Sequence, residues 1–228
     1  MAIKKGLFKT SIGRKNLMAF TGLFISFFLI IHLIGNLILI IPDSYFPIEF
    51  WGNVANAHDM YNAYSHFLVH FWPVTLVAWI LYAALFVHVV DALLITLHNK
   101  KAKGEKYEVT DNSTSTWYSR NMGVLGTIIG IFIFIHMAQF WLQYKVLENE
   151  HDLYNLVIAT FSEWWVLVVY EIGIIALGFH LVHGIESAHR SLGMYPKNVM
   201  GIIKYIAMCF GIVMAVLYAI IPIILYFK

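Results

Sequence analysis

Four histidines lie within long apolar stretches of this chain, where an ionisable side chain is unusual. They are His32 (FLIIHLIGN), His88 (LFVHVVDAL), His136 (IFIHMAQFW) and His180 (LGFHLVHG). An unpartnered imidazole is costly inside a membrane, and such residues are by default candidates for function. Because one of them lies in each of four stretches, the four histidines need a shared explanation.

The overall composition indicates that these stretches cross a membrane. Of the 228 residues, 60% are hydrophobic and only 12% are charged, well below the charge content of a soluble domain. A net charge of +2 does not suggest binding to nucleic acid. The single cysteine, Cys209, rules out a disulfide within the chain, a thiolate metal cluster and a covalent CxxCH haem attachment. Any haem must therefore be bound non-covalently.

Five apolar segments are long enough to span a bilayer, which needs about 20 residues of helix. We predict an all-α integral membrane bundle of five transmembrane helices, with residues 1–228 forming a single domain. The predicted spans are roughly 16–41, 68–97, 121–144, 164–189 and 202–227, joined by loops at 42–67, 98–120, 145–163 and 190–201. The first span is expected to be retained, since it is too long for the apolar region of a signal peptide and lacks an evident cleavage site.

The positive charges are distributed unevenly between the two sides of the predicted bundle. Lys and Arg cluster before the first span, between the second and third, and between the fourth and fifth, against only Lys145 and Lys228 on the opposite side. By the positive-inside rule the N-terminus is cytoplasmic and the C-terminus lies outside. Arg14, Arg120 and Arg190 all fall at cytoplasmic ends of spans.

This orientation converts sequence position into depth. His32 and His136 lie 16 residues beyond the cytoplasmic ends of their spans, about 24 Å of helix. His88 and His180 lie 10 residues from theirs, about 15 Å, so the two levels are predicted to be about 9 Å apart. Two histidines at one depth on different helices can supply both axial ligands of a haem iron. Two levels predict two stacked haems and a path for electrons across the membrane.

Each of these features, taken singly, is also compatible with a purely structural role. A lone transmembrane histidine can simply hydrogen-bond a neighbouring helix, for about 0.6 to 2 kcal/mol. Four histidines at two matched depths are harder to explain as four separate structural contacts. Small residues near the histidines leave room for a flat macrocycle or allow close helix packing, which is the commoner reason. These residues are Gly35, Gly126, Gly130, Gly173, Gly178 and Gly184.

Four segments carry a resemblance that covers essentially the whole chain: TGLFISFFLIIH, FVHVVDAL, STSTWYSRNMG and GFHLVHGIESAHRSLG. With them the chain resembles the five-helix, dihaem cytochrome b subunit that anchors succinate dehydrogenase or fumarate reductase and reacts with menaquinone. The resemblance implies two non-covalent, bis-histidine haem b groups. It pairs the first ligand helix with the third and the second with the fourth, so that His32 and His136 hold the outer iron and His88 and His180 the inner one.

The resemblance also assigns roles around the haems. The H-x-x-x-G spacing of His180 and Gly184 is similar to the ligand helix of the family, so His180 is preferred over His183. His183 is then expected at the haem rim, near a propionate or in a helix contact. Some members of the family carry a glutamate two residues before this ligand, where Gly178 stands here, so that proton route is not predicted.

Two further sets of charged residues have open roles. Three arginines are predicted at the cytoplasmic ends of spans: Arg14, Arg120 and Arg190. They could bind haem propionates or the acidic face of a partner. Alternatively, they are there only because positive charges stay on the cytoplasmic side. Asp91 shares a helix face with His88 and either orients an imidazole or is hydrated.

The implied function is electron transfer between a cytoplasmic iron–sulfur subunit and menaquinone near the outer face. A flavoprotein subunit carrying FAD would interconvert succinate and fumarate, because this chain has no Gly-rich dinucleotide fingerprint. The chain would thus be the quinone-reactive membrane subunit of a succinate:quinone oxidoreductase. We expect it in the bacterial inner (cytoplasmic) membrane, surrounded by lipid, and a dimer of the whole complex is compatible with the resemblance. The sequence does not give the direction of the reaction.

Residues that could exchange protons with the quinone lie in or near the first outer loop. Histidines and carboxylates titrate in a useful range, although each of these residues is individually more typical of a hydrated loop. The candidates are Glu49, His58, Asp59, His66 and His70.

Three other functions share parts of this pattern. A dihaem cytochrome b serving a hydrogenase or formate dehydrogenase would carry similar histidine-bearing helices. A haem-free transporter is usually built from helices broken near mid-membrane, and no paired Gly/Pro interruptions are evident here. A haem-free structural anchor is the third alternative.

Overall fold

The computed structural model describes residues 10–46, 56–102, 116–147, 152–194 and 196–228. Within this part of the chain all regular secondary structure is helical. The elements in order are α1 (Ser11–Leu37), η2 (Ile38–Ile40), η3 (Asp43–Tyr45), α2 (Ala57–His70), α3 (Trp72–Ala102), α4 (Trp117–Arg120), α5 (Met122–His136), the π-helix η5 (Met137–Val146), α6 (Leu153–Phe161), α7 (Trp164–Ser191) and α8 (Met200–Tyr226).

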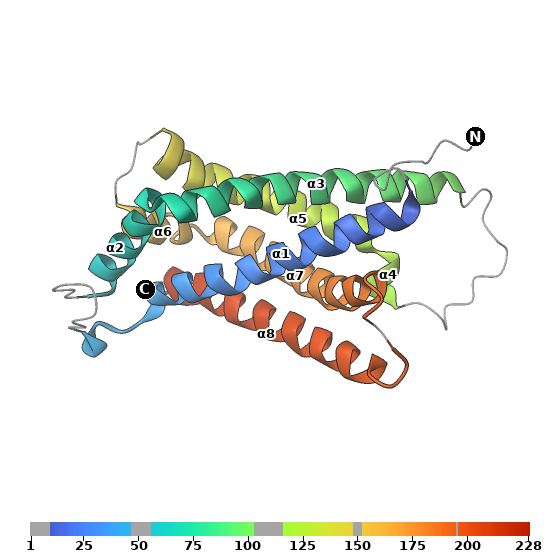
Figure 1. Cartoon of the computed structure of the whole chain (residues 1–228). Helices are drawn as coiled ribbons and strands as arrows, with labels where there is room; N and C mark the ends of the chain where they lie inside the picture. Colours follow the sequence, from blue (N-terminus) through green and yellow to red (C-terminus); the bar gives the residue numbers. More distant parts are fainter. Residues whose placement is uncertain (1–9, 47–55, 103–115, 148–151, 195) are drawn as a thin grey trace.

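The five predicted membrane spans are confirmed, and the chain has the architecture of a multi-pass membrane protein (Figure 1). The long apolar helices cover Ile12–Ile40, Trp72–His98, Met122–Val146, Trp164–Ser191 and Met200–Tyr226. Large apolar side chains point outward from the bundle; Phe20, Phe86 and Phe134 are 63%, 71% and 76% exposed. So much exposed apolar surface is what a lipid-facing exterior requires.

The second span begins later than predicted, at Trp72 rather than at residue 68. The chain breaks at Phe71, which has extended backbone (φ −80°, ψ 105°) and separates α2 from α3. Pro73 lies in the first turn of α3, where the N–H that proline lacks would have no partner within the helix. The break lets α2 turn away from the direction of the spans.

Two of the short helices, α2 and α6, lie largely in segments that were predicted to be loops. In α2, the side chain of Asn56 accepts a hydrogen bond from the backbone N–H of Asp59. In α6, Asp152 accepts one from Asn155 in the same way. These N-caps satisfy backbone donors that are otherwise unpaired at a helix start. Both helices lie at one end of the bundle, together with the C-terminus (Figure 1).

The end of the bundle opposite to α2 and α6 holds the start of α1, α4, and the turn from α7 to α8 (Figure 1). Arg14, Arg120 and Arg190 belong to these elements, so we call this the arginine end. The grouping agrees with the predicted clustering of the arginines on one side.

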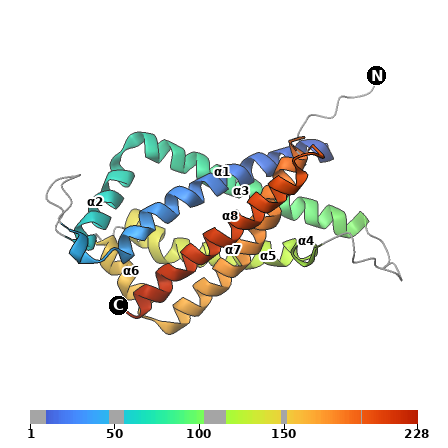
Figure 2. The ribbon, with the colours of Figure 1, turned by 90° about the horizontal axis from the view of Figure 1, so that it is seen from below.

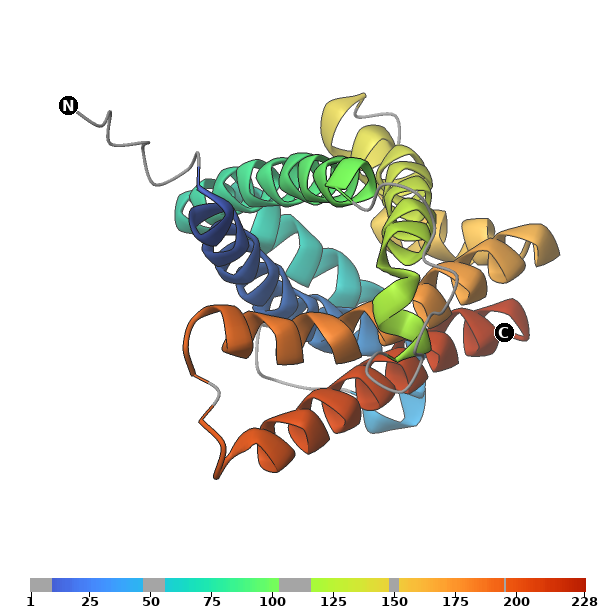
Figure 3. The same ribbon diagram turned by 90° about the vertical axis from the view of Figure 1, so that its right-hand side faces the viewer.

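Four helices surround the interior of the bundle in the order α1, α3, α5, α7, as the end-on view shows (Figure 3). In this arrangement α1 lies across from α5, and α3 lies across from α7. Helix α8 stands outside the four and packs along α7 (Figures 2 and 3). Each of the four surrounding helices carries one of the four intramembrane histidines.

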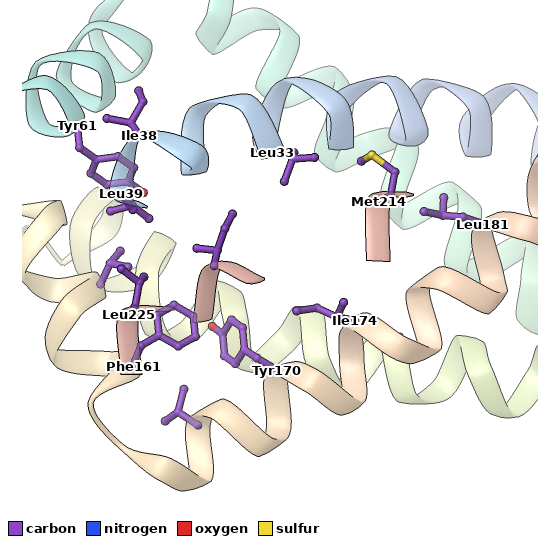
Figure 4. Close-up of a cluster of buried hydrophobic side chains, with 13 residues drawn as sticks. Leu33, Ile38, Leu39, Tyr61, Phe161, Tyr170, Ile174, Leu181, Met214 and Leu225 are labelled. Carbon is purple, nitrogen blue, oxygen red and sulfur yellow. The ribbon is translucent and has the colours of Figure 1, made fainter. Parts of the chain in front are cut away.

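Helix α7 is joined to α8 by a contact between small residues. A Cβ added to Gly211 would lie 2.5 Å from Val182 Cγ2 and 2.9 Å from the carbonyl oxygen of Gly178. Such small-residue contacts let two backbones approach closely in a membrane. Leu33 of α1, Ile174 and Leu181 of α7, and Met214 of α8 add a buried apolar layer around this contact (Figure 4).

We therefore expect Gly211→Leu to separate α8 from α7. Overfilling a packed core costs about 1 to 3 kcal/mol, so the variant should unfold at a lower temperature in detergent than the unmodified chain. Gly201→Leu on the same helix is the matched control, because no atom of the described residues lies within 4 Å of its Cβ position. Equal melting temperatures for the two variants would contradict this packing.

Candidate functional site

His32 of α1 and His136 of α5 meet across the interior of the bundle. Their ring centroids are 5.8 Å apart and their planes are nearly perpendicular, at 85°. A ring of aromatic side chains surrounds the pair: Phe28, Phe132, Phe140, Tyr170 and Tyr218. The pair thus lies in an apolar, aromatic environment built from four helices.

His88 of α3 and His180 of α7 form the second pair, across the other diagonal of the bundle. Their ring centroids are 6.2 Å apart, with the planes at 68°. His183 instead faces Tyr118 near the arginine end, with 6.2 Å between the ring centroids. The proximity of His32 to His136 and of His88 to His180 agrees with the pairing by depth. It also favours His180 over His183 as the partner of His88.

The spacing within each pair is too long for a direct hydrogen bond and suits a shared metal. A metal–nitrogen bond of about 2 Å, with roughly 1 Å more to each ring centre, separates the centroids of two opposed imidazoles by about 6 Å. At centroid distances of 5.8 and 6.2 Å, facing nitrogens would be about 3.5 Å or more apart, beyond the usual N–H···N range. The two rings of each pair are therefore close, but they do not form a hydrogen bond with each other.

The two pairs lie at different levels of the bundle. Tyr170 contacts His136, and His180 follows Tyr170 by ten residues of α7, which is about 15 Å of helix. On α1, Thr21 contacts His88 and lies eleven residues before His32, about 16 Å. These are lengths along helices between a contact residue and a histidine, so the predicted offset of about 9 Å along the membrane normal stays a prediction.

Two of the four imidazoles are held by hydroxyl groups. The Tyr170 hydroxyl donates its proton to Gln139 Oε1 (2.8 Å), so its oxygen accepts a hydrogen bond from His136 Nδ1–H (3.3 Å). The Thr21 hydroxyl donates to a carbonyl of the preceding turn, at 2.9 Å to Leu17 and 3.1 Å to Met18. Its oxygen lies 3.0 Å from His88 Nδ1. With Nδ1 as the donor, the neutral form of each imidazole has its lone pair on Nε2, and this is the form that ligates a metal.

The other two imidazoles have weaker partners. His180 Nδ1 is buried and has no hydrogen-bond partner among the described residues. His32 Nδ1 lies 3.5 Å from the Asn36 amide nitrogen, which donates at 2.8 Å to the His32 carbonyl oxygen. An orphaned nitrogen in a buried site calls for a bound group or a functional reason.

The glycines near the histidines divide into two groups. Gly173 contacts Phe132, Gly178 contacts α8, and Gly35 contacts Tyr64, so these three serve close packing. Around Gly126, Gly130 and Gly184, by contrast, no atom in the described part of the chain lies within 4 Å of the position of a Cβ. Gly184 lies one turn beyond His180 on the same face of α7. The paired imidazoles and the orphaned nitrogen of His180 together fit a prosthetic group held by histidine.

Polar residues that sequence reasoning overlooked complete the site. Thr21, Tyr170 and Gln139 were not singled out as partners of the histidines. Their signal was present, because a hydroxyl or amide in an apolar span has few partners other than a buried polar group. Only the three-dimensional contact reveals which histidine each of them serves.

Charged groups at the arginine end keep their open roles. Arg190 forms an ion pair with Glu186 one turn earlier on α7, at 2.7 Å, and its side chain is largely exposed. Arg120 ends α4 and is exposed, and Arg14 is half-buried in the first turn of α1. Their proposed contacts with propionates or a partner stay predictions.

Two carboxylates within the spans have a buried oxygen atom without a hydrogen-bond partner among the described residues. Asp91 is only 6% exposed, and its Oδ2 has no hydrogen-bond partner among the described residues; the same holds for Glu171 Oε1. The unpartnered Asp91 Oδ2 is compatible with a bound water, so the alternative in which Asp91 is hydrated stays open. An orphaned oxygen so close in sequence to His88 keeps the alternative of an orienting role open.

Four of the quinone candidates lie on α2, at the end opposite to the arginines, and the structure separates them. Glu49 lies outside the described residues. His66 and His70 are exposed and stack on one another, with ring centroids 3.9 Å apart. His58 and Asp59 belong instead to a hydrogen-bonded cluster that joins α2 to α6.

His58 bridges two carboxylates in this cluster. Its Nε2 is 2.7 Å from Asp152 Oδ2 and its Nδ1 is 3.0 Å from Asp59 Oδ1, so both nitrogens can donate when the ring is charged. The hydrogen bonds to Asp152 and then to Asp59 raise the pKa of His58 above its usual 6.5. Burial would raise the pKa of Asp152, but hydrogen bonds from His58, the Asn155 N–H and Asn62 lower it to about 2.

We expect this contact to hold α6 most firmly between about pH 4 and 6.5. Protonated His58 stabilises the fold below its ordinary pKa of 6.5, and the contribution is lost as pH rises through the raised value. Ionised Asp152 contributes above its ordinary pKa of 3.8 and loses its effect only near pH 2. The effect is modest because the His58 side chain is 38% exposed and therefore screened.

The measurement is amide hydrogen exchange over residues 153–161, corrected for the intrinsic effect of pH. His58→Ala should speed exchange a few-fold at pH 5.5 and change it little at pH 9. His66→Ala, on the same helix and away from Asp152, is the control. If the difference in exchange rate between His58→Ala and the unmodified chain grew with rising pH, the predicted pH dependence would have the wrong sign.

Comparison with known proteins gives no match. No family model matches the chain, and no curated protein or solved structure is similar enough to count as a relative. The function is therefore inferred from the residues and geometry of the chain itself.

Proposed function

We propose that the chain is a membrane-embedded cytochrome b subunit that binds two haem b groups non-covalently. In this proposal it carries electrons between a cytoplasmic iron–sulfur subunit and menaquinone, as part of a succinate dehydrogenase or fumarate reductase. The observation that carries it is the pair of cross-bundle histidine contacts, at 5.8 and 6.2 Å, separated by about 15 Å of helix. When bound, each haem would supply a one-electron redox centre.

The residues of the chain would hold and orient these groups. His32 and His136 would ligate the iron far from the arginines, and His88 and His180 the iron nearer to them. The hydroxyls of Thr21 and Tyr170 support one imidazole of each pair, as hydrogen-bond partners of ligating histidines do at metal sites. The aromatic side chains around His32 and His136 exclude water, and burial is one of the means by which proteins tune a haem.

The arginine end is the proposed cytoplasmic face and the docking side for the iron–sulfur and flavoprotein subunits. The uneven distribution of Lys and Arg supports this orientation. Arg120 and Arg190, both exposed there, are suited to an acidic partner surface. Succinate and fumarate chemistry, with FAD, would belong to the flavoprotein, and menaquinone would react near the opposite end.

Replacement of one ligand should remove one haem and leave the other. The purified chain should contain two haems, His136→Ala should retain only the one at His88 and His180, and His180→Ala only the one at His32 and His136. The measurement is the ratio of haem to protein with the dithionite-reduced optical spectrum. His183→Ala is the control and should retain both, since His183 faces Tyr118 rather than a second histidine.

Three results would count against the proposal. A purified chain free of haem would favour a transporter or a structural anchor. Loss of haem from His183→Ala but not from His180→Ala would refute the ligand assignment. Simultaneous loss of both haems from each single variant, in protein that still folds, would refute two independent pairs.

A further inference from the structure

The helix that carries His136 changes its winding directly after this residue. Helix α5 ends at His136, and the next ten residues, Met137–Val146, form a π-helix. π-Helices are rare, usually span a single turn, and occur frequently at functional sites. Gln139 lies in the first turn of this segment, three residues after His136. The unusual backbone therefore coincides with the polar group that holds the Tyr170 hydroxyl.

Tyr170 reaches both residues from the facing helix α7. Its hydroxyl donates to Gln139 Oε1 at 2.8 Å and lies 3.3 Å from His136 Nδ1. Because a hydroxyl has a single proton, the bond to Gln139 leaves only the oxygen for His136, which must then carry its proton on Nδ1. Gln139 thus determines the direction of the hydrogen bond and the tautomer of the imidazole.

The position of Tyr170 is fixed by dense packing. The residue is 5% exposed, and its ring lies edge-on to Phe161 and Phe132, with centroids 4.8 and 5.1 Å away. A Cβ added to Gly173, one turn further along α7, would lie 2.5 Å from Phe132, so α5 and α7 are in close contact here. A hydroxyl carried by so confined a ring has little freedom to turn away from His136.

The two histidines of this pair differ in the support they receive. His136 donates to a neutral oxygen, whereas His32 Nδ1 lies near the Asn36 amide nitrogen, at 3.5 Å. The Tyr61 hydroxyl donates to Asn36 Oδ1 at 3.2 Å and holds that oxygen. The amide therefore offers His32 no acceptor comparable to the Tyr170 hydroxyl.

We infer that Tyr170, oriented by Gln139, is a positioning residue that sets the basicity of His136. This inference rests on the proposed function. An acceptor on the second ring nitrogen makes an imidazole a stronger donor to a metal, which favours the more highly charged, oxidised iron. Tyr170 thereby lowers the reduction potential of the haem shared by His32 and His136 and leaves the other haem unaffected.

The test is a redox titration of the full-length, haem-loaded chain carrying Tyr170→Phe, which keeps the aromatic packing and removes the hydroxyl. We expect two haems to remain and the potential of one to rise. Loss of the partner of a ligating histidine changes metal affinity about 10-fold or more. A tenfold change in the relative stability of the two oxidation states is about 59 mV for one electron. The optical or electron paramagnetic resonance signature of the same haem should shift with it.

Two further variants separate the effect of the hydrogen bond to His136 from the effect of aromatic packing. Gln139→Leu should shift the reduction potential of the same haem in the same direction, and it leaves the aromatic side chains around Tyr170 unchanged. It is the alternative test if Tyr170→Phe binds haem poorly. Tyr218→Phe is the matched control. Its ring lies 6.3 Å from that of His32, but its hydroxyl donates to the Leu29 carbonyl oxygen and not to an imidazole. Repeating Tyr170→Phe in the His180→Ala background assigns the shift to the remaining haem.

The failures of the two proposals are distinguishable. An unmodified chain without haem would refute the proposed function. Two haems whose potentials and spectra do not change in either Tyr170→Phe or Gln139→Leu would refute this inference alone. An equal shift in Tyr218→Phe would show that general packing, rather than the hydrogen bond to His136, sets the potential.

Discussion

The structure depends on the need to provide partners for imidazoles in an apolar interior. Each of the four helices around the interior carries one of the four paired histidines, and a polar group without a partner is costly there. The bundle meets this requirement directly for two of the four, while His180 Nδ1 has no partner among the described residues. The hydroxyl oxygens of Thr21 and Tyr170 accept hydrogen bonds from Nδ1–H of His88 and of His136, respectively. Each histidine also faces the second histidine of its pair across the interior, with ring centroids 5.8 or 6.2 Å apart. This distance suits one metal ion between the two rings.

Helix α7 connects the two histidine levels. It carries His180 at one level and Tyr170 at the other, and it packs against α1, α5 and α8. Gly178 and Gly211 bring α7 and α8 close together, while Gly173 does the same toward α5. These contacts leave α7 little freedom to move. The spacing between the two pairs is therefore a property of one well-packed helix.

The number of spans and the partners in each pair were predictable from the sequence because both depend on simple geometry. Apolar length identifies a membrane helix, and the rise of 1.5 Å per residue relates position to depth. The offset of about 9 Å between the two levels stays a prediction, because residue counts along a helix give length along its axis and not depth in the membrane. The start of α3 was missed because Pro73 falls in an apolar run whose break at Phe71 depends on local backbone geometry.

The short helices and the supporting hydroxyls could not be predicted in the same way. Helix α6 starts at an Asp152 N-cap in a polar segment, where apolar periodicity gives little signal. Tyr170 and Gln139 lie 31 residues apart in sequence, so their hydrogen bond depends on how α5 and α7 face each other. The proposed function likewise starts from residue types in the sequence, and the geometry adds the contacts of His32 with His136 and of His88 with His180.

An experimental density map of the protein purified from membranes would test the central claim most directly. We predict a flat, iron-containing group between the rings of His32 and His136, and a second one between those of His88 and His180. A map in which the two imidazoles of a pair bond directly to each other, or to water alone, would contradict this claim.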